Sequence, residues 1–167
     1  MILADATPLI HLSRAGLLDL LPKLHGRVVV PTSVWEEALG RGEPRPESQA
    51  LLQASESWLE VRALTAQERK ASESLRRGAP VGRGEADTIA LGTPLRSPVL
   101  MDDRVAVNLA RMRGLDTRWT TSMVLEAHFR GILDRKGARR AIEDLVGAGL
   151  WIRPDVLLQI LAILKDR

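Results

Sequence analysis

The chain has no cysteine and no tyrosine, only one phenylalanine, and only three histidines among its 167 residues. The absence of cysteine excludes disulfide bonds and thiolate metal sites. The histidines, His11, His25 and His128, are not spaced as a pair of metal ligands. A metal site in this chain would therefore be built from oxygen ligands. Because aromatic side chains are scarce, nucleic-acid binding would depend on arginine and backbone groups instead of base stacking.

Lysine is also scarce, so that twenty of the 24 basic residues are arginines and the formal net charge is +3. The planar fork of arginine suits phosphate, because it binds two oxygens at once. An arginine-rich composition without cysteine is equally typical of a GC-rich genome or a hot habitat. The charge balance alone therefore does not identify nucleic acid as the partner.

Long apolar runs are absent too. The opening run, residues 1–4, follows no basic region and meets Asp5 at once, which predicts no secretory signal. The most apolar segment, residues 156–164, is too short to span a membrane and carries Gln159. We therefore expect a cytoplasmic protein without a membrane partner, and its length suits one domain with a sizeable core.

Short apolar runs that alternate with helical patterns predict an α/β fold. Strands are expected within residues 2–4, 28–30, 58–64, 99–101 and 114–119. Helical spacing runs over residues 9–21, with a break at Gly16 and an end near Pro22. Further helices are expected from residue 32 and over residues 46–56, 65–77, 84–91, 104–112, 122–129, 136–146 and 154–165. Thr32 or Ser33 is expected to cap one helix, and Thr65 with Glu68 predicts a capping box on another. This alternation predicts a mostly parallel sheet of four to five strands, covered on both faces.

Six acidic residues stand at the ends of predicted strands or in the first turns of predicted helices. They are Asp5, Glu37, Glu85, Asp87, Asp102 and Asp103. Right-handed crossovers place the carboxyl ends of parallel strands along one edge of the sheet, where ligands bind. Carboxylates that converge there repel one another unless a cation neutralises them, and an all-oxygen site suits Mg²⁺ or Mn²⁺. Two such ions, about 3.5–4 Å apart, would suit the hydrolysis of a phosphodiester.

Each of these acids also has a purely structural explanation. Asp5, and one of the adjacent pair Asp102 and Asp103, would serve equally well as helix N-caps. Glu37, Glu85 and Asp87 would stabilise the first turn of a helix through its dipole. The pattern alone therefore leaves both interpretations open for each residue.

Taken in order, these segments resemble the PIN-domain proteins, near the VapC-type ribonuclease toxins. The resemblance covers nearly the whole chain. It rests on four blocks: Asp5-Ala6-Thr7-Pro8-Leu9-Ile10, residues 28–31 with Val34 and Glu37, Gly84-Glu85-Ala86-Asp87 continuing to Leu91, and Asp102-Asp103-Arg104. The blocks occur in the order found in the family. Thr120-Thr121 stands where the family usually has Gly-Thr.

The resemblance implies a three-layer α/β/α sandwich that hydrolyses RNA with bound Mg²⁺ or Mn²⁺. Residues 1–150 would form the nuclease domain, and residues 151–167 an amphipathic helix packed on that domain or on a partner. The catalytic acids implied are Asp5, Glu37, Glu85 and Asp103. The metal ligands implied are Asp5, Glu85, Asp87, Asp102 and Asp103, with supporting hydroxyl groups from Thr7 and Thr121.

Two functions stay open at this point. The first is a metal-dependent ribonuclease, with the toxin of a toxin–antitoxin pair as one form of it. The alternative is a non-catalytic PIN-like module that binds RNA or protein. The expected partners are RNA, a second copy of the chain and an antitoxin protein, the last two through the wide apolar surface of residues 156–164.

Overall fold

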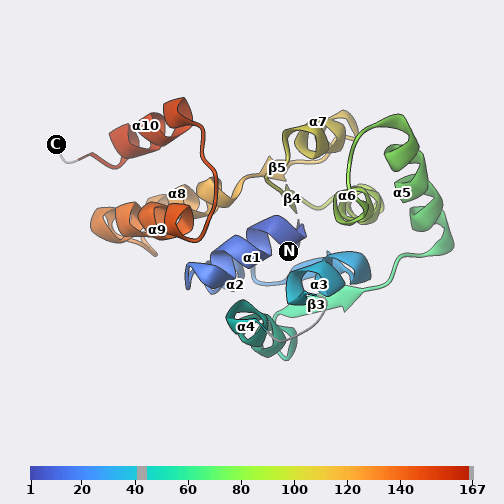
Figure 1. Ribbon diagram of the computed structural model, residues 1–167, viewed down its shortest axis with the longest axis horizontal. Coiled ribbons are helices and arrows are strands. Elements are labelled where there is room, and N and C mark those ends of the chain that lie inside the picture. Colours follow the sequence, from blue (N-terminus) through green and yellow to red (C-terminus); the bar gives the residue numbers. More distant parts are fainter. Residues whose placement is uncertain (41–44, 166–167) are drawn as a thin grey trace.

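The computed structural model describes residues 1–40 and 45–165 and has an α/β fold (Figure 1). One sheet contains five strands, all parallel, in the order β3-β2-β1-β4-β5. The strands are β1 (Ile2–Ala4), β2 (Val28–Pro31), β3 (Leu59–Arg62), β4 (Val99–Leu100) and β5 (Thr117–Arg118). The prediction of a parallel sheet with four to five strands is confirmed, and β1 is its middle strand.

Helices cover both faces of this sheet. In the part of the chain that the structure describes they are α1 (Ala6–Arg14), α2 (Leu20–His25), α3 (Thr32–Leu39), α4 (Pro46–Ser55), α5 (Ala66–Gly78), α6 (Arg83–Leu95), α7 (Arg104–Met112), α8 (Thr120–Phe129), α9 (Arg135–Gly147) and α10 (Pro154–Ile163). Figure 1 shows α6 and α7 on one side of the sheet and α1, α3 and α4 on the other. The predicted three-layer α/β/α sandwich is therefore confirmed.

The strands supply both hydrophobic cores because their residues alternate between the two faces. Ile2 and Ala4 lie in the core that contains α1, whereas Leu3 lies in the core that contains α6. The neighbouring strand repeats this pattern, with Val28 in the first core and Val29 in the second. A strand that is apolar at every position is what a sheet covered on both faces requires.

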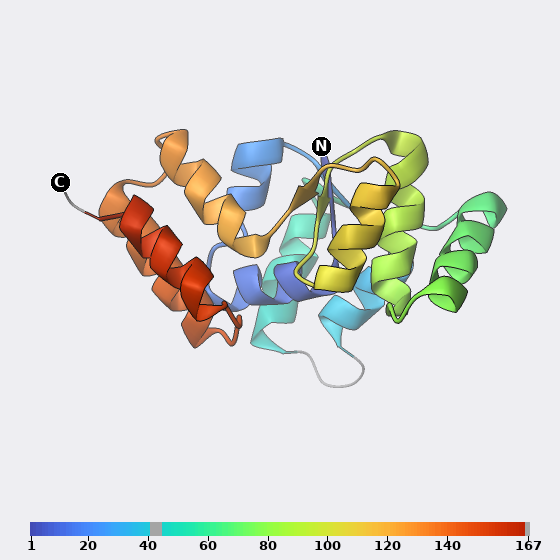
Figure 2. The same cartoon turned by 90° about the horizontal axis from the view of Figure 1, so that it is seen from above.

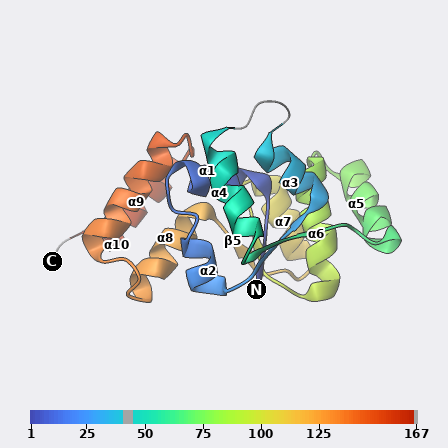
Figure 3. The same ribbon diagram turned by 90° about the horizontal axis from the view of Figure 1, so that it is seen from below.

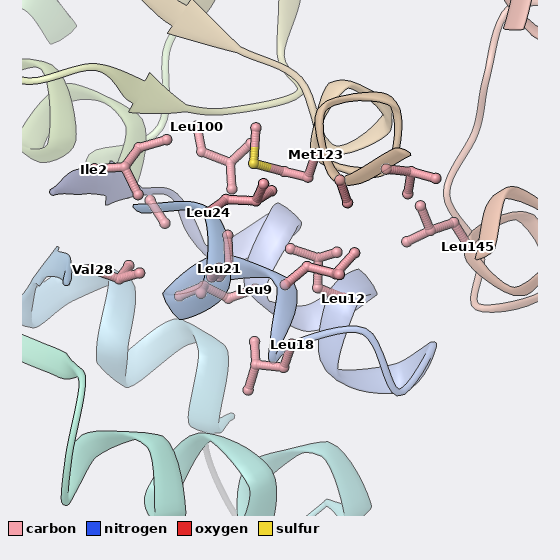
Figure 4. Packing of buried hydrophobic residues seen from close by; sticks show 14 of the residues in the cluster. Ile2, Leu9, Leu12, Leu18, Leu21, Leu24, Val28, Leu100, Met123 and Leu145 are labelled. Atoms are coloured by element: carbon pink, nitrogen blue, oxygen red, sulfur yellow. The ribbon is translucent and has the colours of Figure 1, made fainter. Parts of the chain in front are cut away.

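The larger core joins the beginning of the chain to its end (Figure 4). Leu9 and Leu12 of α1 lie in it with Met123 of α8 and Leu145 of α9. Ile160 of α10 is buried in the same core. The last helix thus packs on its own chain, while the boundary expected at residue 150 stays a prediction.

The molecule is elongated, with α5 at one end and the C-terminal helices at the other (Figures 2 and 3). Several helices begin directly at the carboxyl edge of the sheet. Ala6 opens α1 one residue after Asp5, Thr32 opens α3 immediately after β2, and Thr120 opens α8 two residues after β5. The chain therefore gathers strand ends and helix starts along this one edge. No helix in the described residues is both long enough and apolar enough to cross a membrane.

Most local predictions agree with the structure, and two are wrong. Thr65 and Glu68 form the expected capping box. Pro22 does not end a helix but lies in the first turn of α2, where its missing N–H has no intrahelical partner to lose. Neither Thr32 nor Ser33 caps α3, because Pro31 takes the N-cap position and no side chain makes a capping hydrogen bond there. The glycine- and proline-rich sequence over residues 40–46 predicts a loop, and residues 41–44 lie outside the described part of the chain.

Candidate active site

The carboxyl edge of the sheet brings five acidic residues within electrostatic reach of one another. We call Asp5, Glu37, Glu85, Asp102 and Asp103 the acidic cluster. Burial raises the pKa of Asp5, and the charges of Glu85, Glu37 and Asp102 raise it further. Burial also raises the pKa of Glu85, with smaller contributions from the charges of Asp103 and Glu37. Residues that are far apart in the sequence therefore share one electrostatic environment.

Asp5 is the most deeply buried member of the cluster. It is 5% exposed and occupies the N-cap position of α1, yet its side chain makes no capping hydrogen bond. Burial is the main reason why the pKa of Asp5 is raised to about 7, and the backbone amide of Ala6 offsets it only in part. No basic side chain among the described residues forms an ion pair with Asp5. Helix capping, the structural alternative for this residue, is not its role in the structure.

Gly84 leaves open the space into which two carboxylates point. A Cβ atom at this position would lie 3.2 Å from Oδ1 of Asp5 and 3.3 Å from Oε2 of Glu37. It would also lie 3.2 Å from Cγ2 of Val34, which is fully buried. The sequence pattern places Gly84 only within a motif at a helix start and does not predict this function. The signal was a glycine in the first turn of an apolar helix, where a better helix former would be expected.

Glu85 combines both of the roles that the sequence allowed. Its Oε2 accepts a hydrogen bond of 2.6 Å from the backbone N–H of Gly82, which stabilises the first turn of α6. The same carboxylate is half-buried and interacts electrostatically with Glu37 and Asp103. Glu85 therefore stabilises its helix and belongs to the cluster.

The adjacent pair after β4 divides into two roles, as the sequence allowed. Asp103 is exposed and caps α7, because the backbone N–H of Ala106 donates to its Oδ1 at 2.8 Å. Asp102 accepts two hydrogen bonds from Thr120, from the backbone N–H to Oδ1 at 2.9 Å and from the hydroxyl to Oδ2 at 2.6 Å. Burial raises the pKa of Asp102, although both of these hydrogen bonds oppose the shift. Asp102 therefore stays in the cluster as a carboxylate that is held in place.

The hydroxyl group that contacts the cluster belongs to Thr120, whereas the sequence analysis favoured Thr121. Thr120 is fully buried, and it begins α8. Neither Thr7, which is exposed, nor Thr121 makes a side-chain hydrogen bond among the described residues. The family pattern places glycine at position 120, so only the structure reveals that the hydroxyl of Thr120 contacts the cluster.

Asp87, a predicted metal ligand, lies apart from the cluster. The hydroxyl groups of Ser33 and Ser72 donate to its Oδ2 and Oδ1, each at 2.5 Å, and Nε of Arg83 lies 3.7 Å from Oδ2. Asp87 thereby links α3, α5 and α6. Residues two positions apart on a helix do not share a face, so Glu85 and Asp87 cannot both point toward the cluster.

The cluster suits a hard divalent cation by the chemistry of its oxygen ligands. Within residues 1–40 and 45–165, no three carboxylate or imidazole groups are close enough together to enclose a metal ion. Carboxylates without a cation between them repel one another, which opposes a closed ligand set. Asp5, which is buried and forms no ion pair among the described residues, and the space beside Gly84 nevertheless fit Mg²⁺ or Mn²⁺.

Thr120→Val should destabilise the fold by about 1–3 kcal/mol at pH 8, because the half-buried carboxylate of Asp102 loses its hydroxyl donor. The pKa of Asp102 should rise further in this variant, so the loss of stability should be smaller at about pH 5. Urea unfolding at both pH values measures the effect. The matched control is Thr121→Val, which removes a hydroxyl without a partner. An equal loss in both variants would contradict the assigned role of Thr120.

Comparison with known proteins identifies the family of this chain. The chain matches the family DUF3368, described as a PIN domain, over residues 1–166. A search of curated proteins found no match. PIN domains are generally nucleases, which hydrolyse phosphodiester bonds and typically use divalent metals. The resemblance to PIN-domain proteins is confirmed, whereas the closer likeness to VapC-type toxins stays a prediction. The chain belongs to the PIN-domain family.

Proposed function

We propose that this chain is a metal-dependent ribonuclease that cleaves RNA at the acidic cluster. The observation that carries the proposal is Asp5, a buried carboxylate that forms no ion pair among the described residues and has other acids around it. Burying such a charge is costly unless a proton or a cation neutralises it. A fold that keeps this arrangement is suited to binding a metal ion.

The residues divide the work between metal binding and positioning. Mg²⁺ or Mn²⁺, held by Asp5, Glu37, Glu85, Asp102 and Asp103, would neutralise the cluster and activate water toward a phosphodiester. Thr120 fixes the orientation of Asp102 through two hydrogen bonds, and Gly84 keeps the space between Asp5 and Glu37 open. Asp5 has to be ionised to act as a ligand, so metal affinity should rise with pH up to about 7.

Purified protein with Mn²⁺ should cleave a mixed panel of single-stranded RNAs, and EDTA should abolish the cleavage. Asp5→Asn and Glu37→Gln should each lower kcat/KM by at least about 10²-fold, because each removes a negative ligand from the site. Asp19→Asn is the control, since Asp19 is exposed and makes no capping hydrogen bond. An intact RNA panel with both Mn²⁺ and Mg²⁺ would refute the ribonuclease. RNA binding without cleavage would favour a non-catalytic binding module instead.

A further inference from the structure

Two hollows adjoin at the carboxyl edge of the sheet. The first, of about 470 Å³, is lined by Glu37 and Gly84 of the candidate site and also by Ser33 and Arg83. The second, of about 450 Å³, shares Ser33 and Arg83 with the first and extends between α5 and the end of β3. We call this second cavity the arginine hollow. The shared lining makes a continuous route from the acidic cluster to α5.

Three arginines line the arginine hollow. Arg69 and Arg76 lie two turns apart on α5, and therefore on the same face of that helix, while Arg83 opens α6. Nη1 of Arg69 donates to the backbone carbonyl of Leu64 at 2.6 Å, which holds this side chain at the rim. Arg76 has no hydrogen bond or ion pair among the described residues. The side chain of Arg83 is 67% exposed, and its one ion pair within the described residues is with Asp87, at 3.7 Å. Guanidinium donors therefore remain available for an anionic ligand.

Two carboxylates, Glu73 and Asp87, also line the hollow. Both oxygens of Asp87 already accept hydrogen bonds from Ser33 and Ser72, so this buried group belongs to the floor of the cavity. The three arginines exceed the two acids by one positive charge. This surplus suits singly charged phosphodiesters near the rim better than a free phosphate dianion.

We propose that the arginine hollow binds the phosphodiester backbone of single-stranded RNA beside the bond that is cleaved. The inference rests on the proposed function, because the route begins at the acidic cluster. Arginine forks bind phosphate oxygens strongly, and Ala63 and Leu64 in the lining offer apolar contact to a ribose or a base. A cavity of this volume between a helix and a strand end has room for a short part of one strand but not for a duplex.

The test measures RNA binding separately from cleavage. Asp5→Asn protein in EDTA is titrated into a short fluorescein-labelled single-stranded RNA, and fluorescence anisotropy gives Kd at several salt concentrations. Adding Arg76→Gln should weaken binding by about fivefold to tenfold. It should also lower the slope of log Kd against log salt concentration by about one, the value for one lost phosphate contact. Adding Arg77→Gln, on the same helix but outside the hollow, should change neither quantity. A duplex of the same sequence should compete poorly.

Each other outcome is equally informative. Equal effects of Arg76→Gln and Arg77→Gln, full competition by the duplex, or no RNA binding at all would overturn the subsite. If the wild-type chain cleaves RNA while Arg76→Gln changes neither Kd nor KM, the subsite is wrong and the ribonuclease stands. If nothing is cleaved but binding still depends on Arg76, the subsite stands and the ribonuclease is wrong.

Discussion

Asp5→Asn should stabilise the folded protein by about 2–4 kcal/mol at pH 8 in the absence of metal, although the same change removes a proposed catalytic residue. Burial, followed by the charges of Glu85, Glu37 and Asp102, raises the pKa of Asp5 from 3.8 to about 7. Ionising Asp5 in the folded state therefore costs up to about 4 kcal/mol relative to the unfolded chain. Asparagine carries no charge and avoids this cost.

The direction of the pH effect follows from the raised pKa. The folded protein binds this proton more tightly than the unfolded chain does, so the wild type loses stability as the pH rises from about 4 to about 7. The raised pKa values of Glu85 and Asp102 act in the same direction. Urea unfolding across this range in EDTA should show a shallower fall for Asp5→Asn than for the wild type. A destabilised variant, or one with the pH dependence of the wild type, would contradict this account of Asp5.

Bound metal should reverse this order, so that the wild type becomes more stable than Asp5→Asn. Mn²⁺ that binds only the folded state should raise the Tm of the wild type in a concentration-dependent way. The Tm of Asp5→Asn should respond far less, because a ligand is missing, while Asp19→Asn should respond as the wild type does. Thermal unfolding with increasing Mn²⁺ measures both effects.

Gly84→Ala should lower kcat/KM by about tenfold to 10²-fold without lowering stability. The new Cβ would lie 3.2 Å from Oδ1 of Asp5 and 3.3 Å from Oε2 of Glu37, so the two carboxylates have to move apart by a few tenths of an ångström. Small misplacements of catalytic groups have effects of this size. Alanine is also the better helix former by about 1 kcal/mol, which offsets the contact with Val34.

The control for this change is Gly147→Ala, at the end of α9, where a Cβ would meet nothing within 4 Å. Cleavage assays and urea unfolding of both variants separate an effect on the site from an effect on the fold. Wild-type kcat/KM in Gly84→Ala would show that the space between Asp5 and Glu37 is not used in catalysis.

The fold was predictable because its strands carry unambiguous signals. Residues 28–30 are three consecutive valines between Gly26 and Pro31, and such a run suits only a strand that is buried on both faces. The order of the strands, with β1 in the middle, follows from pairings between distant residues and could not be derived from local pattern. The prediction at Pro22 was wrong because proline has two effects on a helix. It ends a helix when it lies in the interior, but it is tolerated in the first turn, where Pro22 lies in α2.

The candidate site was predictable only as a set of acids. Their positions at strand ends and helix starts identified all five members of the acidic cluster. Tertiary packing decides which residues point inward, so Asp87 was grouped with Glu85 although it bonds to Ser33 and Ser72. The hydroxyl of Thr120 was missed for the same reason, since its partner Asp102 lies eighteen residues earlier in the chain.

The position of β1 also determines when the site can form during folding. β1 pairs with β2 early in the sequence, but its other neighbour is β4, where Leu3 lies opposite Val99 and Ala4 opposite Leu100. Such distant pairings form late, because the chain has to close a long loop first. During synthesis, Asp5 emerges long before Asp102 and Thr120. A nascent chain therefore has no complete acidic cluster until Asp102 and Asp103 have left the ribosome.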